Sequence, residues 1–315
     1  MKHEARLYTS ISDRTRRSQS APIARHGEQY TERLVSAVNC FQIIKTVLDE
    51  TYAQIDIKGA KAKDKAISDR LDLFTEEYKD ILYGKDIHYG DPVSRFAYIF
   101  RYVTSHANMV CDLTRQSDEI RALLKKENVS VSCVGGGPGS DLVGILKFLD
   151  ARKQKPKRLT CFLLDRNKTW NECWCDLGSM VDLDFRLYTN FMELDVCQKT
   201  TYAPFAKYPG ADLFTFVYFV SEVHKHMDQA KTFFGDVFSK MKPGALVLYI
   251  DNNDSRFYGW FDKMCATHGL NPLETINGRH QMPSEEEKSD LGEYLKKFHE
   301  PKLRASVAFR VARKG

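Results

Sequence analysis

The sequence predicts an α/β fold in which a mainly parallel sheet carries helices on both faces. Three observations predict it. From residue 128 onward, short apolar runs suited to buried strands alternate with amphipathic helical stretches. A glycine-rich corner at residues 135–139 separates the first apolar run from the first helix, where α/β sheets commonly bind ligands. Hydrophobic residues make up 43% of the 315 residues, which is ordinary for a globular protein.

The stretch 129–149, VSVSCVGGGPGSDLVGILKFL, carries most of this information. Gly135, Gly136, Gly137 and Gly139 lie between its apolar strand and its helix. Glycine adopts positive φ without strain and lets a ligand lie against bare main chain. The helix that follows directs unpaired N–H groups at the same place. The corner therefore predicts a site for a small, polar-ended cofactor; a tight turn without a ligand is the alternative.

The spacing of the glycines narrows the choice of cofactor. A dinucleotide fingerprint needs a third glycine where this chain has Ser140, and no Gly-Lys-Ser/Thr of a P-loop follows. The G-x-G-x-G spacing at residues 135, 137 and 139 resembles the first motif of class I S-adenosylmethionine-dependent methyltransferases. In that family the loop accommodates the amino-acid end of S-adenosyl-L-methionine.

Two carboxylates strengthen the resemblance. Asp165 ends the apolar run 159–164, where an acidic residue is suited to accept both ribose hydroxyls. Asp195 follows a third run, and in members of the family a carboxylate at this position typically accepts a hydrogen bond from the adenine amino group. Their neighbours Arg166 and Val196 are expected at the same cofactor site.

The remaining runs complete the order of parts. The third run lies around residues 184–188, and a Met-Lys-Pro-Gly turn at 241–244 precedes the fifth. The other expected strands are 211–218, 245–250, 272–277 and 303–311, of which the last two would form a closing antiparallel pair. The resemblance covers residues 129–315 and implies a Rossmann-like seven-stranded methyltransferase sheet.

Two positions depart from the family pattern. Cys133 stands two residues before the first glycine, where the family usually has an acidic residue that binds the cofactor's amino group. Backbone carbonyls or Asp141 would have to replace it. After the fourth strand the chain reads VYFVSEV at 217–223, without an Asp/Asn-Pro-Pro-aromatic motif. This argues against a base amine or a glutamine amide as the acceptor.

The preceding part of the chain has a different character. Residues 1–26 contain Arg14, Arg16, Arg17 and Arg25 among Ser and Thr without apolar periodicity, so we expect a disordered basic tail. Residues 27–127 are expected to form a helical N-terminal region, and 128–315 the S-adenosylmethionine-binding domain. Apolar stripes at 31–52 and 67–81 recur at helical spacing.

A third helix is expected to begin at Asp91-Pro92, an N-cap followed by proline. One face of it carries Arg95, Tyr98, Tyr102 and His106. In one interpretation Tyr98 and Arg95 lie near the site. In the other, the tyrosines pack on the sheet domain while Arg95 and His106 are solvated.

The reaction requires little from the protein beyond alignment and exclusion of water, because the sulfonium methyl carbon is already electrophilic. Tyr218 or Phe219 could stabilise the cation through an aromatic face. Glu222 and His224, after the fourth strand, are the candidate catalytic residues. For His224 a solvated loop histidine is the alternative.

Charge and cysteine content bear on partners. The net charge is +5, and the basic run at 152–158 is expected at the amino ends of the strands, away from the cofactor. RNA contact is therefore expected, if at all, through the basic tail. The eight cysteines lack a framework spacing, and the pair at 173 and 175 has no matching pair for zinc, so no metal is predicted. With no membrane-length apolar run or signal peptide, an intracellular location, cytoplasmic or nuclear, without a membrane is expected.

The loop 278–302, between the last two strands, is expected to lie above the site as a lid or as a simple surface insertion. Three functions remain open: a methyltransferase acting on a small acceptor, one acting on RNA or protein, and a catalytically inactive S-adenosylmethionine-binding sensor or scaffold.

Overall fold

The computed structural model describes residues 40–80, 87–152, 156–173, 183–205, 207–281, 288–298 and 300–315. The expected basic tail, the second cysteine of the 173–175 pair and the acidic run 285–287 lie outside the described residues.

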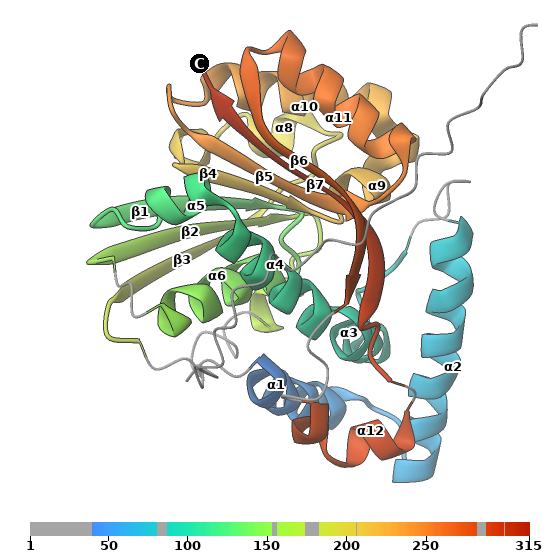
Figure 1. Cartoon of the computed structure of the whole chain (residues 1–315). Coiled ribbons are helices and arrows are strands. Elements are labelled where there is room, and N and C mark those ends of the chain that lie inside the picture. Colours follow the sequence, from blue (N-terminus) through green and yellow to red (C-terminus); the bar gives the residue numbers. More distant parts are fainter. Residues whose placement is uncertain are drawn as a thin grey trace, which may run out of the picture.

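A single sheet of seven strands organises the chain (Figure 1). Its order is β3-β2-β1-β4-β5-β7-β6, with β7 antiparallel to both neighbours and the other pairs parallel. The strands are β1 (Asn128–Val134), β2 (Arg158–Asp165), β3 (Arg186–Glu193), β4 (Leu213–Val217), β5 (Leu246–Asn252), β6 (Leu270–Gln281) and β7 (Arg304–Lys314). The predicted Rossmann-like seven-stranded sheet, with its closing antiparallel pair, is confirmed.

The third strand lies further along the chain than predicted. It spans Arg186–Glu193 rather than residues 184–188. It is an edge strand whose side chains are mostly exposed or half-buried, so it lacks the continuous apolar run that marks β1, β2 and β4. The last two strands are also longer than predicted, because polar residues continue the antiparallel ladder beyond the apolar centre.

Helices cover both faces of the sheet (Figure 1). Alternate residues of β1 serve the two cores: Val131 and Cys133 face the core of α4 (Thr104–Gln116) and α6 (Ser140–Ala151), while Val134 faces the other. Gly144 lets α4 and α6 pack closely, since a Cβ there would lie 2.5 Å from the Ala107 carbonyl oxygen. The opposite face is covered by α8 (Lys199–Tyr202), η3 (Tyr208–Gly210), α9 (Phe219–Val223), η4 (His224–His226), α10 (Met227–Lys240) and α11 (Ser255–Thr267).

The N-terminal helices share the core of the α4–α6 face. They are α1 (Cys40–Gln54), α2 (Ala60–Asp80), α3 (Pro92–Tyr98), the π-helical turn η2 (Ile99–Val103) and α5 (Asp118–Leu123). Phe41 and Phe96 belong to the same buried cluster as Val131 of the sheet. The predicted N-cap is present, because the Asp91 carboxylate accepts a hydrogen bond from the Ser94 amide at 2.9 Å.

The described part of the loop 278–302 packs beneath the N-terminal helices. It contains η5 (Lys288–Leu291) and α12 (Glu293–Lys297), which lies beside α1 (Figure 1). The Tyr294 ring contacts Tyr52 and Phe96, and its hydroxyl donates to Asp49 at 2.7 Å. This short helix therefore belongs to the hydrophobic core of the N-terminal helices, so the helical part of the loop is neither the lid nor the simple surface insertion that the sequence left open.

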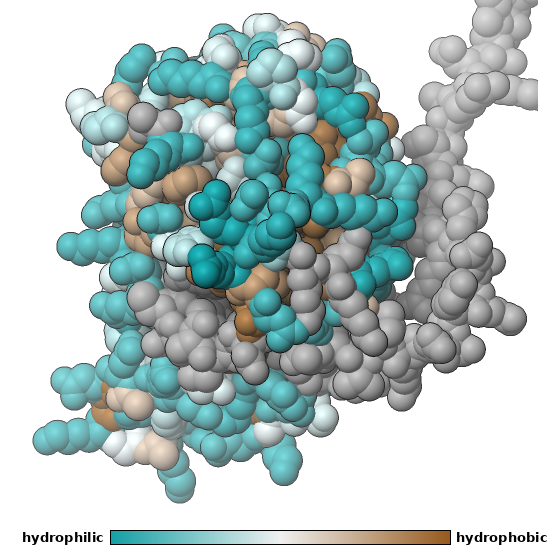
Figure 2. All heavy atoms as spheres, turned by 90° about the vertical axis from the view of Figure 1, so that its left-hand side faces the viewer, coloured by the Kyte–Doolittle hydropathy of each residue, from teal (hydrophilic) through white to brown (hydrophobic). Residues whose placement is uncertain are grey.

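Hydrophilic side chains cover most of the face drawn in Figure 2, and smaller hydrophobic areas lie between them. Among the described residues, no helix combines the length and the apolar character that crossing a membrane demands.

Candidate functional site

The glycine corner lies at the point where the strand order reverses. β1 is flanked by β2 on one side and β4 on the other, so side chains from the carboxyl ends of several strands meet next to residues 135–139. Gly135, Gly137 and Gly139 have φ angles of 65°, 46° and 89°, which explains why glycine occupies all three positions. Gly139 also forms the N-cap of α6.

The main chain at Gly135 contacts a side chain of the protein. A Cβ at this residue would overlap the ring of Phe219, which lies directly on the glycine. At Gly135 the expected bare main chain is therefore partly covered by the Phe219 ring, although Gly135 still lines the neighbouring cavity. The glycine makes room for Phe219, and Phe219 in turn forms a wall of the neighbouring cavity.

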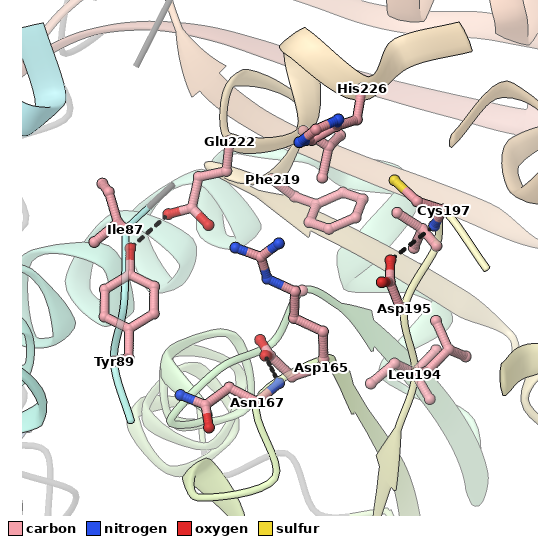
Figure 3. A pocket seen from close by; sticks show the side chains of 15 residues that line it. Ile87, Tyr89, Asp165, Asn167, Leu194, Asp195, Cys197, Phe219, Glu222 and His226 are labelled. Carbon is pink, nitrogen blue, oxygen red and sulfur yellow. Dashed lines mark hydrogen bonds between the residues drawn. The ribbon is translucent and has the colours of Figure 1, made fainter. Parts of the chain in front are cut away.

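That cavity, the strand-end pocket, is bounded by the ends of β2 and β3, by α9 and by residues 87–89 (Figure 3). It is narrow, with a volume of about 80 Å³. Its apolar walls are Ile87, Leu164, Leu194, Val196, Phe219 and Val223. Its polar groups are Tyr89, Asp165, Arg166, Asn167, Asp195, Cys197, Glu222 and His226. Of the predicted cofactor residues, the pocket brings together Gly135, Asp165, Arg166, Asp195 and Val196.

Backbone amides hold both predicted aspartates. The two Asp165 oxygens accept from the amides of Gly137, at 3.0 Å, and Asn167, at 2.8 Å. The Asp195 oxygens accept from the Cys197 amide, at 2.9 Å, and from the Gln198 side chain, at 2.8 Å. Since a carboxylate offers about four acceptor sites, each aspartate keeps acceptor capacity for a ligand. Burial raises the pKa of Asp165 to about 6.

Glu222 stands across the pocket from Asp165 (Figure 3). Its Oε1 accepts from the hydroxyls of Tyr78, at 3.3 Å, and Tyr89, at 3.4 Å. Burial raises the pKa of Glu222 to about 7, and the neighbouring carboxylates of Asp165 and Asp251 add to the increase. The carboxyl of Glu222 therefore titrates close to neutral pH, which is where a proton-transferring group is most effective.

Three predicted side chains lie elsewhere, and Gly136, Gly137 and Gly139 do not line the strand-end pocket either. Tyr218 has a φ of 53°, and its ring stacks on His106 at 4.3 Å instead of entering the strand-end pocket. His224 packs against Phe257, and it is His226, two residues later, that lines the pocket. Asp141 is buried beneath the glycine corner and accepts from the Thr215 hydroxyl at 2.5 Å.

The Tyr218 ring lines a second cavity, the tyrosine pocket, together with Tyr78, Tyr102, His106, Lys302 and residues after β5. The expectation that His106 and Arg95 are solvated is wrong, because both side chains are buried. Arg95 donates to the Gly90 carbonyl at 2.9 Å. Tyr98 packs on Tyr89 with a ring separation of 4.8 Å, one residue removed from the strand-end pocket.

Cys133 is a core residue. It is fully buried, and its Sγ lies 3.7 Å from the Sγ of Cys161 on β2. It therefore cannot reach the strand-end pocket as the acidic residue of the family does. Among the residues that the structure describes, no cluster of His, Cys, Asp or Glu could hold a metal ion.

Asp141 predicts how stability depends on pH. Burial raises its pKa from 3.8 to about 7, so the folded protein holds a proton that the unfolded chain releases above about pH 4. The free energy of unfolding should therefore fall as the pH rises from about 4 to 7, by about 4 kcal/mol from this residue. Asp165, Asp251 and Glu222 act in the same direction.

The Asp141→Asn variant, which cannot ionise, should lose less stability between pH 5 and pH 8 than the natural chain. Urea unfolding at the two pH values measures this difference, and Asp72→Asn, at an exposed carboxylate on α2, is the control. Equal losses for the Asp141 variant and the natural chain would contradict the account of Asp141.

Sequence reasoning missed the residues contributed from the N-terminal region. Tyr78 and Tyr89 reach Glu222 from more than 130 positions away in the chain. Tyr78 lies in the predicted apolar stripe at 67–81, and no local pattern in the sequence singles out Tyr89. Asn167 and His226, by contrast, closely follow residues that were named, and the position of Asn167 two residues after Asp165 was a usable signal.

Comparisons with known proteins give similarity at the level of whole structures. No model of a protein family matches the chain, and no curated protein matches it. A candidate RNA methyltransferase from Pyrococcus horikoshii is 15% identical, with a TM-score of 0.40 over 68% of this chain and 87% of that one. An S-adenosylmethionine-dependent methyltransferase from Methanosarcina mazei is 9% identical, with a TM-score of 0.40 over 63% and 97%.

The cyclase SpnF is also similar, at 14% identity and a TM-score of 0.41 over 66% of this chain and 81% of that one. One fold can host several reactions, so a shared fold does not assign a chemistry to this chain.

Proposed function

We propose that this chain is an S-adenosyl-L-methionine-dependent methyltransferase that binds its cofactor in the strand-end pocket. The observation that carries the proposal is the convergence of two carboxylates on one apolar-walled cavity. Asp165 ends β2, Asp195 follows β3, and both face the cavity beside the glycine corner. This arrangement suits a nucleoside, which combines a flat apolar base with hydroxyl and amino donors.

Each part of the cofactor has a matching wall. The Asp165 carboxylate accepts hydrogen bonds from the ribose hydroxyls, and the Asp195 carboxylate accepts one from the adenine amino group. The adenine ring lies among Leu194, Val196 and Phe219. Because the pocket of about 80 Å³ is smaller than a cavity that holds benzene, its walls have to part when the base enters. Rotation about the side-chain bonds of Phe219 can move its ring and so enlarge the pocket.

Acidic side chains outnumber basic ones among the residues that line this pocket, which favours the sulfonium cofactor. Asp165, Asp195 and Glu222 face the single guanidinium of Arg166 among the lining residues. Such an excess of acidic groups stabilises a ligand that bears a sulfonium and an ammonium. When the cofactor binds, it supplies an electrophilic methyl group, and the protein aligns the acceptor with it and excludes water.

Glu222 is the proposed proton acceptor for the reaction. An acceptor atom that carries a proton passes it to the Glu222 carboxylate as the new bond to the methyl carbon forms. The bond between sulfur and the methyl carbon breaks at the same time, and its electron pair stays on sulfur. A pKa of about 7 leaves a large fraction of Glu222 ionised at neutral pH, as a base requires.

Removing the Asp165 carboxylate tests the binding half of the proposal. Isothermal titration of S-adenosylhomocysteine into Asp165→Ala should give a Kd raised by at least ~10-fold, because hydrogen bonds to a charged group contribute about 1.5–3 kcal/mol. Asp72→Asn should bind as the natural chain does. An unchanged Kd in a folded Asp165 variant would refute the assignment of the ribose to this carboxylate.

A further inference from the structure

The tyrosine pocket adjoins the strand-end pocket along one wall. Tyr218 lines the tyrosine pocket and its successor Phe219 lines the strand-end pocket, and Ser221 and Glu222 divide in the same way. Tyr78 lines the tyrosine pocket and donates to Glu222 at 3.3 Å. The proposed base therefore lines the strand-end pocket and is hydrogen-bonded to Tyr78, a wall residue of the tyrosine pocket.

The aromatic side of the tyrosine pocket consists of stacked, uncharged rings. His106 lies between Tyr218, at 4.3 Å and 15° between the ring planes, and Tyr102, at 5.8 Å and 29°. Burial lowers the pKa of His106 to about 3, so the imidazole is neutral at physiological pH. The cavity has a volume of about 360 Å³, more than twice that of an engineered cavity that binds benzene.

One cation faces these rings. The Lys302 ammonium lies 5.7 Å from the centre of the Tyr102 ring and 5.9 Å from that of Tyr218. Its backbone amide is anchored by a hydrogen bond to the Arg101 carbonyl at 2.9 Å. Among the described residues, no carboxylate forms an ion pair with it, and burial together with Arg101 lowers its pKa. A partly buried ammonium without a counter-ion is stabilised by an anionic ligand.

The acidic residue that lines the same pocket is already neutralised. Asp254 accepts from the Arg256 guanidinium at 2.6 Å and caps α11 through the Arg256 amide at 2.9 Å. Asn252 donates to the Ser221 hydroxyl at 3.3 Å, and its amide group belongs to the polar side of the cavity. The polar side of the cavity therefore offers hydrogen bonds to a ligand. Among the described residues, Lys302 is the charged lining residue for which no oppositely charged side chain is present as a partner.

We infer that the tyrosine pocket binds the methyl acceptor and that this acceptor is a compact, planar aromatic molecule carrying an anionic group. The inference rests on the proposed function. The ring of the acceptor packs against the aromatic side of the cavity, formed by Tyr102, His106 and Tyr218, and its carboxylate or phosphate pairs with Lys302. The nucleophilic atom points toward Glu222, which receives its proton when the methyl group moves from sulfur to the acceptor.

The experiment is transfer of radiolabel from methyl-labelled S-adenosylmethionine by the full chain, with cell extract separated into small molecules, RNA and protein. The labelled product should be a small molecule that absorbs ultraviolet light and is retained on an anion-exchange resin. An aromatic acid and a mononucleotide both meet this description, and phosphatase treatment separates the two sources because it releases only the phosphate-bearing product from the resin.

Variants at Lys302 distinguish binding of the acceptor from a purely structural role, because only the former predicts a change in KM without a change in cofactor affinity. Lys302→Met should raise KM for the acceptor by at least tenfold while the Kd of S-adenosylhomocysteine stays unchanged, and Lys302→Arg should recover most of the loss. Lys296→Met, at an exposed lysine of α12, is the matched control.

A neutral or cationic labelled product, or label found only in RNA or protein, would overturn the inference. So would an unchanged KM in Lys302→Met. Absence of S-adenosylhomocysteine binding to the folded natural chain would instead remove the proposed function itself, so the two failures are distinguishable.

Discussion

The Glu222→Gln variant should transfer methyl groups ~10²–10⁴-fold more slowly than the natural chain at saturating cofactor, the range that general-base catalysis supplies. Glutamine keeps the shape and the hydrogen bonds of the side chain but cannot accept the proton. The affinity for S-adenosylhomocysteine should change much less than kcat, because the nucleoside is assigned to Asp165 and Asp195. The rate of label transfer under single-turnover conditions measures the effect.

The pH dependence of the same rate provides a second readout. Glu222 must lose its proton to act, so the rate of the natural chain should rise with pH through a midpoint near 7 and then level off. This rising limb should be absent in Glu222→Gln. Glu127→Gln is a suitable control, because Glu127 is an exposed carboxylate just before β1, at the end of the strands that lies away from the strand-end pocket.

Full kcat in Glu222→Gln would exclude Glu222 as the base. Cofactor binding by the natural chain without any labelled product would favour the alternative function, a sensor or scaffold that has lost catalysis. Cys133 at the usual acidic position makes that alternative worth measuring.

Replacing Gly135 by alanine should damage both stability and binding. The φ of 65° alone costs a residue with a side chain about 1–2 kcal/mol. The new Cβ would also overlap the Phe219 ring, and overpacking of this kind costs a further ~1–3 kcal/mol. If Phe219 yields, its ring moves into the strand-end pocket, so we expect the Kd of S-adenosylhomocysteine to rise at least ~10-fold.

Gly244→Ala separates the two effects, because Gly244 also has a positive φ, of 79°, but a Cβ there meets nothing within 4 Å. It should lose only the conformational term and keep its affinity for S-adenosylhomocysteine. When Phe219→Ala is already present, adding Gly135→Ala should cost only the conformational term, because the ring that the new Cβ would meet is gone. Equal denaturation midpoints and equal affinities for the two single alanine variants would contradict the role given to Phe219.

The parts of the fold that sequence reasoning located are those with a continuous apolar signal. β1, β2, β4 and β5 are buried on both faces, so their residues form apolar runs. The edge strand β3 has no such run, and its predicted position was displaced toward the N-terminus. The packing of α12 against α1 and α3 depends on contacts of Tyr294 with Tyr52 and Phe96, which lie about 240 and about 200 positions away, and a local pattern does not record such contacts.

The site divides in a similar way. Asp165 and Asp195 end their strands, so topology alone brings them to the same pocket. Tyr218 and Phe219 are adjacent aromatic residues, and the left-handed backbone at Tyr218 decides which of them enters that pocket. The turn η4 likewise presents His226 instead of His224. The direction in which each of these side chains points depends on individual backbone angles, and the identity of the residue does not determine those angles.

A crystal structure of the full chain with S-adenosylhomocysteine tests the central claim most directly. We predict the ribose hydroxyls on the Asp165 carboxylate, the adenine amino group on Asp195, and the Phe219 ring displaced from its present contact with Gly135. An S-adenosylhomocysteine molecule bound elsewhere, or crystals grown at saturating ligand in which Phe219 still covers Gly135 and the strand-end pocket is empty, would contradict it.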